Sequence, residues 1–129
     1  VSMIRKFNLT EEVKLLGTIN NMARFYKNLD INLLVSKSES FPNVIIEAAS
    51  QGVYCIASDV GDIKYSFSKF VGIFNNKKKS LLLILEKTIH QIFKNDRKIF
   101  HKKLNFQKFI KNNYNIQIQL NSYEKIFNE

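Results

Sequence analysis

Short, mostly apolar runs alternate along the chain with longer segments in which apolar residues recur at helical spacing. Runs of four or five such residues bounded by glycine, asparagine or aspartate are typical of strands. We expect strands at residues 13–16, 31–35, 54–57 and 71–74. The apolar character of residues 31–35 is typical of a parallel strand that is covered on both faces. Because strands and helices alternate through short connections, the pattern predicts one parallel α/β sheet flanked by helices.

Helical periodicity marks the segments between these strands and most of the chain after residue 80. Asn20 or Asn21 and Ser80 are suited to capping helix amino termini, Pro42 to a first helical position, and Gly52 to a helix end. A short helical turn is expected after residue 62, and helices are expected at residues 1–8, 20–28, 42–51, 81–94, 97–111 and 116–127. The candidate core contacts of these helices are Met22, Phe25, Tyr26, Val44, Ile45, Ala48, Phe100, Leu104, Phe109, Leu120, Tyr123 and Phe127.

A chain of 129 residues is long enough for one domain with a substantial core, so residues 1–129 are interpreted as a single domain. No apolar run approaches the roughly 20 residues of a membrane span. Cys55 is the only cysteine of the sequence and lies in an apolar run, which predicts a buried thiol in a reducing compartment. One cysteine and two distant histidines, His90 and His101, do not form a zinc ligand set, and both histidines are expected to be surface or packing residues.

The sequence has a net charge of +9, which is compatible with nucleic acid, an anionic membrane surface or a phosphate-bearing substrate as a partner. Much of the excess lies in residues 77–79 and 94–111. Lysines on the outer faces of amphipathic helices usually form a solvated surface. The sequence contains no Cys/His finger, no RNA-binding aromatic pair and no Gly-x-x-Gly clamp, so nucleic acid is not an expected partner.

The stretch from Glu39 to Glu47 follows a predicted strand and opens a predicted helix. The first N–H groups of a helix have no internal partner, and the helix dipole favours negative charge there. Two carboxylates beside this end would repel a phosphate unless they hold something else, and a carboxylate can accept hydrogen bonds from two sugar hydroxyls. The pattern therefore predicts a ligand with a diphosphate and a polyol part. The alternative is that Glu39 caps a turn and Glu47 is a solvated helix residue.

Residues 39–48, ESFPNVIIEA, resemble the E-x7-E motif of retaining glycosyltransferases of family 4, also called group 1, which have the GT-B fold. Residues 13–17 (VKLLG), 30–38 (DINLLVSKS) and 57–61 (ASDVG) are similar to further segments of that family, in the same order and at matching spacing. The resemblance covers roughly residues 9–75 and implies the carboxyl-terminal, Rossmann-like half of a GT-B fold, followed by helices.

The resemblance implies a nucleotide-diphosphate-sugar donor, with no covalently bound cofactor and no metal. Glu47 would bind the ribose hydroxyls of the donor. Glu39 would be the catalytic carboxylate, which holds a hydroxyl of the transferred sugar and stabilises positive charge that develops on its ring. Backbone N–H groups around four residues would face the sugar or the diphosphate, namely those around Phe41, Pro42 (which itself has none), Asn43 and Val44.

The sequence also departs from the family pattern. Val35 stands where proline is common, Ser40 where glycine is common, and Asp62 where a second glycine is usual. Residues 64–66, Lys-Tyr-Ser, lack the acidic residue often found there, and residues 58–62 are expected either to border the ligand cleft or to form only a turn. The family's Arg/Lys pair, the first strand and helix of this half, and the amino-terminal acceptor-binding domain would all precede Val1.

We interpret the chain as the donor-binding part of a glycosyltransferase that transfers a sugar with retention to a hydroxyl acceptor. The isolated chain is expected to be inactive, and its partners are the nucleotide-sugar and the acceptor-binding domain of the same protein. We expect a cytoplasmic location, with the cationic helices of residues 77–111 against an anionic membrane surface. The rival interpretation is a non-catalytic, basic α/β module that binds a nucleotide, nucleic acid or a protein partner.

Overall fold

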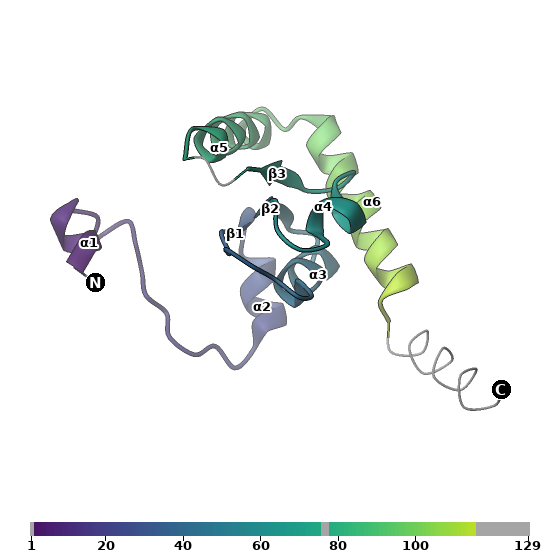
Figure 1. Ribbon diagram of the computed structural model, residues 1–129, viewed down its shortest axis with the longest axis horizontal. Coiled ribbons are helices and arrows are strands. Elements are labelled where there is room, and N and C mark those ends of the chain that lie inside the picture. Colours follow the sequence, from purple (N-terminus) through teal and green to yellow (C-terminus); the bar gives the residue numbers. More distant parts are fainter. Residues whose placement is uncertain (1, 76–77, 116–129) are drawn as a thin grey trace.

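A three-stranded parallel sheet lies at the centre of the protein in this computed structural model, which describes residues 2–75 and 78–115 (Figure 1). The strands are ordered β1-β2-β3 and both neighbouring pairs are parallel, which confirms the predicted α/β class. The bounds of the helices and strands are α1 Ser2–Lys6, α2 Met22–Lys27, β1 Ile31–Leu34, α3 Asn43–Ser50, β2 Tyr54–Ser58, α4 Ile63–Phe67, β3 Gly72–Phe74, α5 Lys78–Phe93 and α6 Arg97–Asn113.

Strand β2 divides the core into two layers. All five of its residues are buried, and successive side chains of a strand point to opposite faces of a sheet. Cys55 and Ala57 pack with residues of α2, α3, α4 and α6, whereas Tyr54 and Ile56 pack with residues of α5 and with Ile99 of α6. Figure 1 shows α5 on one side of the sheet and α2 and α3 on the other. The apolar segment predicted at residues 81–94 therefore lies against the sheet, as expected.

The predicted start of α2 and the predicted carboxyl end of α3 are confirmed by their hydrogen bonds. Gly52 follows α3 with a φ of +78°, in the left-handed region that favours glycine. The Gly52 N–H donates to the Ala49 carbonyl at 2.9 Å and the Val53 N–H to the Ala48 carbonyl at 3.1 Å, a pair of bonds that closes many helices. Asn21 caps α2, because its side-chain oxygen accepts a backbone N–H of the first turn at 2.9 Å. None of the described helices combines the length and the apolar content that crossing a bilayer requires.

The prediction of a strand at residues 13–16 is wrong. Val13, Leu15 and Leu16 are 39%, 68% and 58% exposed, and Figure 1 shows the chain between α1 and α2 running away from the sheet. A strand needs a neighbour that exchanges backbone hydrogen bonds with it. No strand of the described residues lies beside this segment, so it forms no β-ladder despite its apolar pattern.

The inward face of α6 also differs from the prediction. Its buried residues are Ile99, Phe106 and Ile110. Phe100 and Leu104, which the pattern predicts as core contacts, are 62% and 36% exposed. Large apolar residues stand next to each other at positions 99 and 100. Helical periodicity alone therefore does not decide which of the two faces the core.

Further expectations need correction. Met22, predicted as a core contact of α2, is 36% exposed. Leu33 of the edge strand β1 is 40% exposed, so β1 is not fully covered on both faces. Val44 is also 40% exposed, and α3 instead buries Ile45, Ala48 and Ala49. Ser80 lies inside α5, which begins at Lys78, so it is not the residue that caps this helix. The helix predicted at residues 116–127, with Leu120, Tyr123 and Phe127, lies outside the described residues.

Cys55 is fully buried, as predicted. Burial raises the pKa of its thiol from the ordinary 9.0 to about 12, and the Asn32 side chain, 3.9 Å from the sulfur, opposes this rise only in part. We therefore expect a thiol reagent such as DTNB to react with the folded protein near neutral pH only as fast as it unfolds, and rapidly in urea. Because the folded-state pKa is the higher one, stability should also fall as the pH rises from about 9 towards 12. Equal reaction rates in native buffer and urea would contradict this burial.

Candidate functional site

The candidate site lies where β1 and β2 end at the same edge of the sheet. Ser36 follows β1, and Ser58 is the last residue of β2. The Ser58 hydroxyl donates to the carbonyl oxygen of Ser36 at 2.7 Å, and the Ser36 hydroxyl donates to the carboxylate of Glu39. These bonds hold the half-buried Glu39 at the carboxyl edge of the sheet, as predicted. Ser36 and Ser58 therefore position the carboxylate, a role that the sequence pattern does not reveal.

Gly61 brings the loop after β2 into contact with the backbone of Glu39. Its φ is +52°, which side chains rarely tolerate. A Cβ atom at this position would lie 2.3 Å from the carbonyl oxygen of Glu39. Only glycine permits so close an approach. Of the two expectations for residues 58–62, the structure thus favours a loop that borders the site.

Pro42 directly precedes α3 rather than occupying its first position. Its φ of −84° and ψ of 68° are not helical, but its carbonyl accepts hydrogen bonds from the N–H groups of Ile45 and Ile46 at 2.9 and 3.3 Å. The Asn43 N–H donates to the Phe41 carbonyl at 3.0 Å. The N–H of Val44, in the first turn, has no possible acceptor within the helix. Among residues 41–44, the backbone donors that suit an anion are therefore those of Phe41 and Val44.

Glu47 projects from the second turn of α3 and is exposed. The hydroxyl of Tyr26, from α2, donates to its carboxylate at 3.3 Å. Burial, and next the charge of Glu47, raises the pKa of Tyr26 to about 12, so the hydroxyl stays protonated and remains a donor. The sequence pattern predicts Tyr26 only as a core residue, although a buried tyrosine hydroxyl generally requires a polar partner. That partner here is the second glutamate of the motif.

Apolar side chains border the two carboxylates. Phe41 is 50% exposed and its ring lies 5.9 Å from the ring of Tyr114, which follows α6. Val44 is exposed in the first turn of α3. Neither side chain is part of the buried core. The start of α3 therefore offers apolar contact, backbone donors and carboxylates together, a combination suited to a ligand with a sugar and a charged group.

The remaining candidate residues do not join this site. Asp59 forms an exposed ion pair with Lys64, with a separation of 3.1 Å, which is worth about 1 kcal/mol or less. His90 and His101 are exposed, in agreement with their expected surface roles. Across residues 2–75 and 78–115, no three His, Cys, Asp or Glu side chains gather as a metal-binding group.

Comparisons with known proteins support the resemblance. The family described as "Glycosyl transferases group 1" matches residues 2–71. N-acetyl-alpha-D-glucosaminyl L-malate synthase from Bacillus anthracis is 35% identical over 63 residues, which are 49% of this chain and 16% of that protein. Sucrose-phosphate synthase from Thermosynechococcus elongatus superimposes with a TM-score of 0.79 at 21% identity, over 98% of this chain and 33% of that one. The chain thus spans about a sixth of the first relative and about a third of the second.

The structural likeness shows a Rossmann-like fragment of the GT-B fold, in agreement with the three-stranded parallel sheet flanked by helices. The family match extends over more than half of the chain and includes the segment from Glu39 to Glu47. The chain therefore belongs to the glycosyl transferases group 1 family.

Proposed function

We propose that this chain is the donor-binding part of a glycosyltransferase that moves a sugar, with retention, from a nucleoside-diphosphate-sugar to a hydroxyl acceptor. The product would be a glycan, a glycolipid or a cell-surface polysaccharide. The observation that carries the proposal is the pairing of two oriented carboxylates with the start of α3. Glu39 is held by Ser36 at the sheet edge, and Glu47 is held by Tyr26 on the helix.

In the proposed reaction the acceptor hydroxyl attacks the anomeric carbon while the bond from that carbon to the diphosphate oxygen breaks. The acceptor proton leaves with the diphosphate or passes to solvent. Positive charge develops on the sugar ring, and the carboxylate of Glu39 would stabilise it. Because the Ser36 hydroxyl donates to one carboxylate oxygen of Glu39, the other can accept a sugar hydroxyl.

Binding of the donor would involve the other residues of the motif. Glu47 would accept hydrogen bonds from the ribose hydroxyls, with its carboxylate oriented by Tyr26. The N–H groups of Phe41 and Val44 would face the diphosphate, where the helix dipole adds to the attraction. The proposal requires no metal and no covalently bound cofactor. The related N-acetyl-alpha-D-glucosaminyl L-malate synthase is named for a product in which a sugar is joined to L-malate, which is consistent with a sugar donor.

We place the complete protein in the cytoplasm, with the acceptor bound by an amino-terminal domain of the same protein. The cationic helices would draw it to the anionic surface of a membrane, with about 1 kcal/mol for each lysine close to that surface. Nucleic acid is not part of the proposal.

The 129-residue chain by itself should transfer no sugar. No cationic side chain of the described residues forms a hydrogen bond or ion pair with Glu39 or Glu47, so the charge that develops on the leaving diphosphate would be poorly stabilised. The measurement is incubation with nucleotide-sugars and candidate hydroxyl acceptors, with product detected by mass spectrometry. Turnover by the chain alone, above that of its Glu39→Ala variant, would contradict this prediction.

The proposal itself is tested by the stereochemistry of the product made by the complete protein. A panel of α-linked nucleotide-sugars is supplied with alcohols as acceptors, and the anomeric configuration of any product is read by NMR. We expect an α-linked product. A β-linked product would overturn retention, and donor binding without any product would favour the rival, non-catalytic module.

A further inference from the structure

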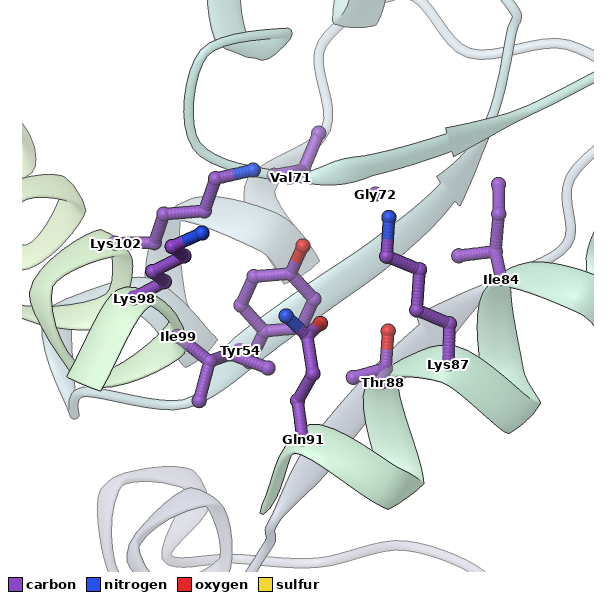
Figure 2. A pocket seen from close by; sticks show the side chains of 10 residues that line it. All are labelled: Tyr54, Val71, Gly72, Ile84, Lys87, Thr88, Gln91, Lys98, Ile99 and Lys102. Atoms are coloured by element: carbon purple, nitrogen blue, oxygen red, sulfur yellow. The ribbon is translucent and has the colours of Figure 1, made fainter. Parts of the chain in front are cut away.

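A cavity lies at the opposite edge of the sheet from Glu39. Tyr54 begins β2 and Gly72 begins β3, so both lie where the parallel strands start. Together with α5 and α6 they border a cavity of about 330 Å³. Figure 2 shows the side chains around it. Its volume falls in the lower range of small-molecule sites in proteins.

Three lysines from two helices converge on this cavity. Lys87 belongs to α5, and Lys98 and Lys102 stand one turn apart on α6. In Figure 2 their ammonium groups reach toward the same space from opposite sides. None of the described residues that line the cavity is acidic, and none of the three lysines forms an ion pair within the described part of the chain. Like charges brought together repel, and an anion between them removes that cost.

Neutral hydrogen-bonding groups lie beneath the lysines. Thr88 and Tyr54 are only 3% and 6% exposed, and Figure 2 shows the Tyr54 hydroxyl directed into the hollow. Burial raises the pKa of Tyr54, so its hydroxyl stays protonated and can donate a hydrogen bond. The amide nitrogen of Gln91 donates to Asp96 at 3.0 Å, which fixes the Gln91 side chain at the rim.

Asp96 bonds to Gln91, which lines the cavity, and its carboxylate is already engaged. It caps α6 by accepting the backbone N–H of Lys98 at 2.8 Å, and it also accepts the Gln91 amide. It does not line the cavity. The lysine side chains therefore keep their donors for a ligand.

We propose that this cavity binds a phosphate-bearing anion, at a site separate from the proposed donor site. A tetrahedral phosphate offers acceptor oxygens in several directions, which matches three ammonium groups from two helices above a tyrosine hydroxyl. The proposed donor site uses a helix start and two carboxylates, whereas this cavity uses three side-chain cations and a tyrosine hydroxyl. The two sites therefore select different groups, and a phosphate at one does not require occupancy of the other.

The test is a titration of the protein with inorganic phosphate, followed by NMR of the backbone amides of Gly72 and Thr88. We expect saturable shifts at these amides. In the Lys98→Gln/Lys102→Gln variant the apparent Kd should rise about tenfold or more, as expected for lost charged hydrogen bonds. The control is Lys108→Gln/Lys111→Gln, which removes the same charge from exposed positions of α6 outside the cavity. The control should change Kd by less than about threefold, since distant surface charges are screened.

Vesicles distinguish a lipid headgroup from a soluble phosphate as the source of the anion. Flotation is compared with phosphatidylglycerol and with phosphatidylcholine vesicles for both double variants. Binding to phosphatidylglycerol that is lost only in Lys98→Gln/Lys102→Gln assigns the site to a lipid headgroup. Saturable phosphate shifts without such vesicle binding assign it to a soluble ligand. No saturable shift together with no selective vesicle binding, or equal loss in both variants, would overturn the proposal.

Discussion

Gly61→Ala is expected to lower the free energy of unfolding by about 2–5 kcal/mol and to displace Glu39 in any protein that still folds. The left-handed backbone of Gly61 would cost an L-residue about 1–2 kcal/mol. The added Cβ atom would lie 2.3 Å from the carbonyl oxygen of Glu39, so the loop or the Glu39 turn must move. Overpacking of this kind typically costs a further 1–3 kcal/mol or so. Urea denaturation measures the loss.

Gly17→Ala is the matched control for this prediction. Gly17 also has a positive φ, +64°, but a Cβ atom there would meet nothing within 4 Å. It lies in the exposed segment between α1 and α2, which can relax, so we expect a loss of about 1 kcal/mol or less. A similar loss in both variants would show that backbone strain alone matters. The contact between Gly61 and Glu39 would then have no part in building the site.

The sequence predicted the strands of the sheet correctly wherever a neighbouring strand is present to pair with them. Three of the four predicted strands are present, because residues of β1, β2 and β3 find neighbours and bury apolar side chains. Residues 13–16 have the same kind of apolar pattern but form no strand. The pattern shows which residues could be buried and does not show whether a neighbouring strand is there to pair with them. Apolar character likewise did not show that Leu33 would be exposed on an edge strand.

The sequence predicted the two glutamates of the candidate site but not the residues that hydrogen-bond to them. The spacing of Glu39 and Glu47 placed one before α3 and the other on its second turn, as the structure has them. Tyr26, the partner of Glu47, stands on α2, and only folding brings the two side chains together. Ser36 stands three residues before Glu39, but nothing in the pattern marks its hydroxyl as the donor to that carboxylate. Serine and tyrosine are too common for a linear pattern to single them out.

Exchange of the two glutamates for alanine in the complete protein should separate their roles. Glu47 would contact ribose hydroxyls, whose charge does not change in the reaction, so Glu47→Ala should raise the donor KM with a smaller effect on kcat. Glu39 would lie near the carbon where positive charge develops, so Glu39→Ala should lower kcat more than it weakens binding. Loss of one well-placed charged hydrogen bond corresponds to about ten- to a hundredfold in either constant.

Two further variants make this comparison sharper. Glu39→Gln keeps hydrogen-bonding capacity and removes the charge, so it should be nearly as severe as Glu39→Ala if charge stabilisation dominates. It should be milder than alanine if hydrogen bonding dominates. Glu86→Ala is the control for the Glu39 and Glu47 variants, because Glu86 is an exposed glutamate on α5 and its loss should leave kcat and KM unchanged.

The most direct test of the proposed donor site is steady-state kinetics of the complete protein and its Glu39→Ala, Glu47→Ala and Glu86→Ala variants with varied nucleotide-sugar. Circular dichroism establishes first that each variant is folded. We predict a kcat loss of about ten- to a hundredfold for Glu39→Ala, a KM rise of similar size for Glu47→Ala, and no change for Glu86→Ala. If both motif variants instead keep the kcat/KM of the unmodified protein, the two glutamates are surface residues and the start of α3 does not bind the donor.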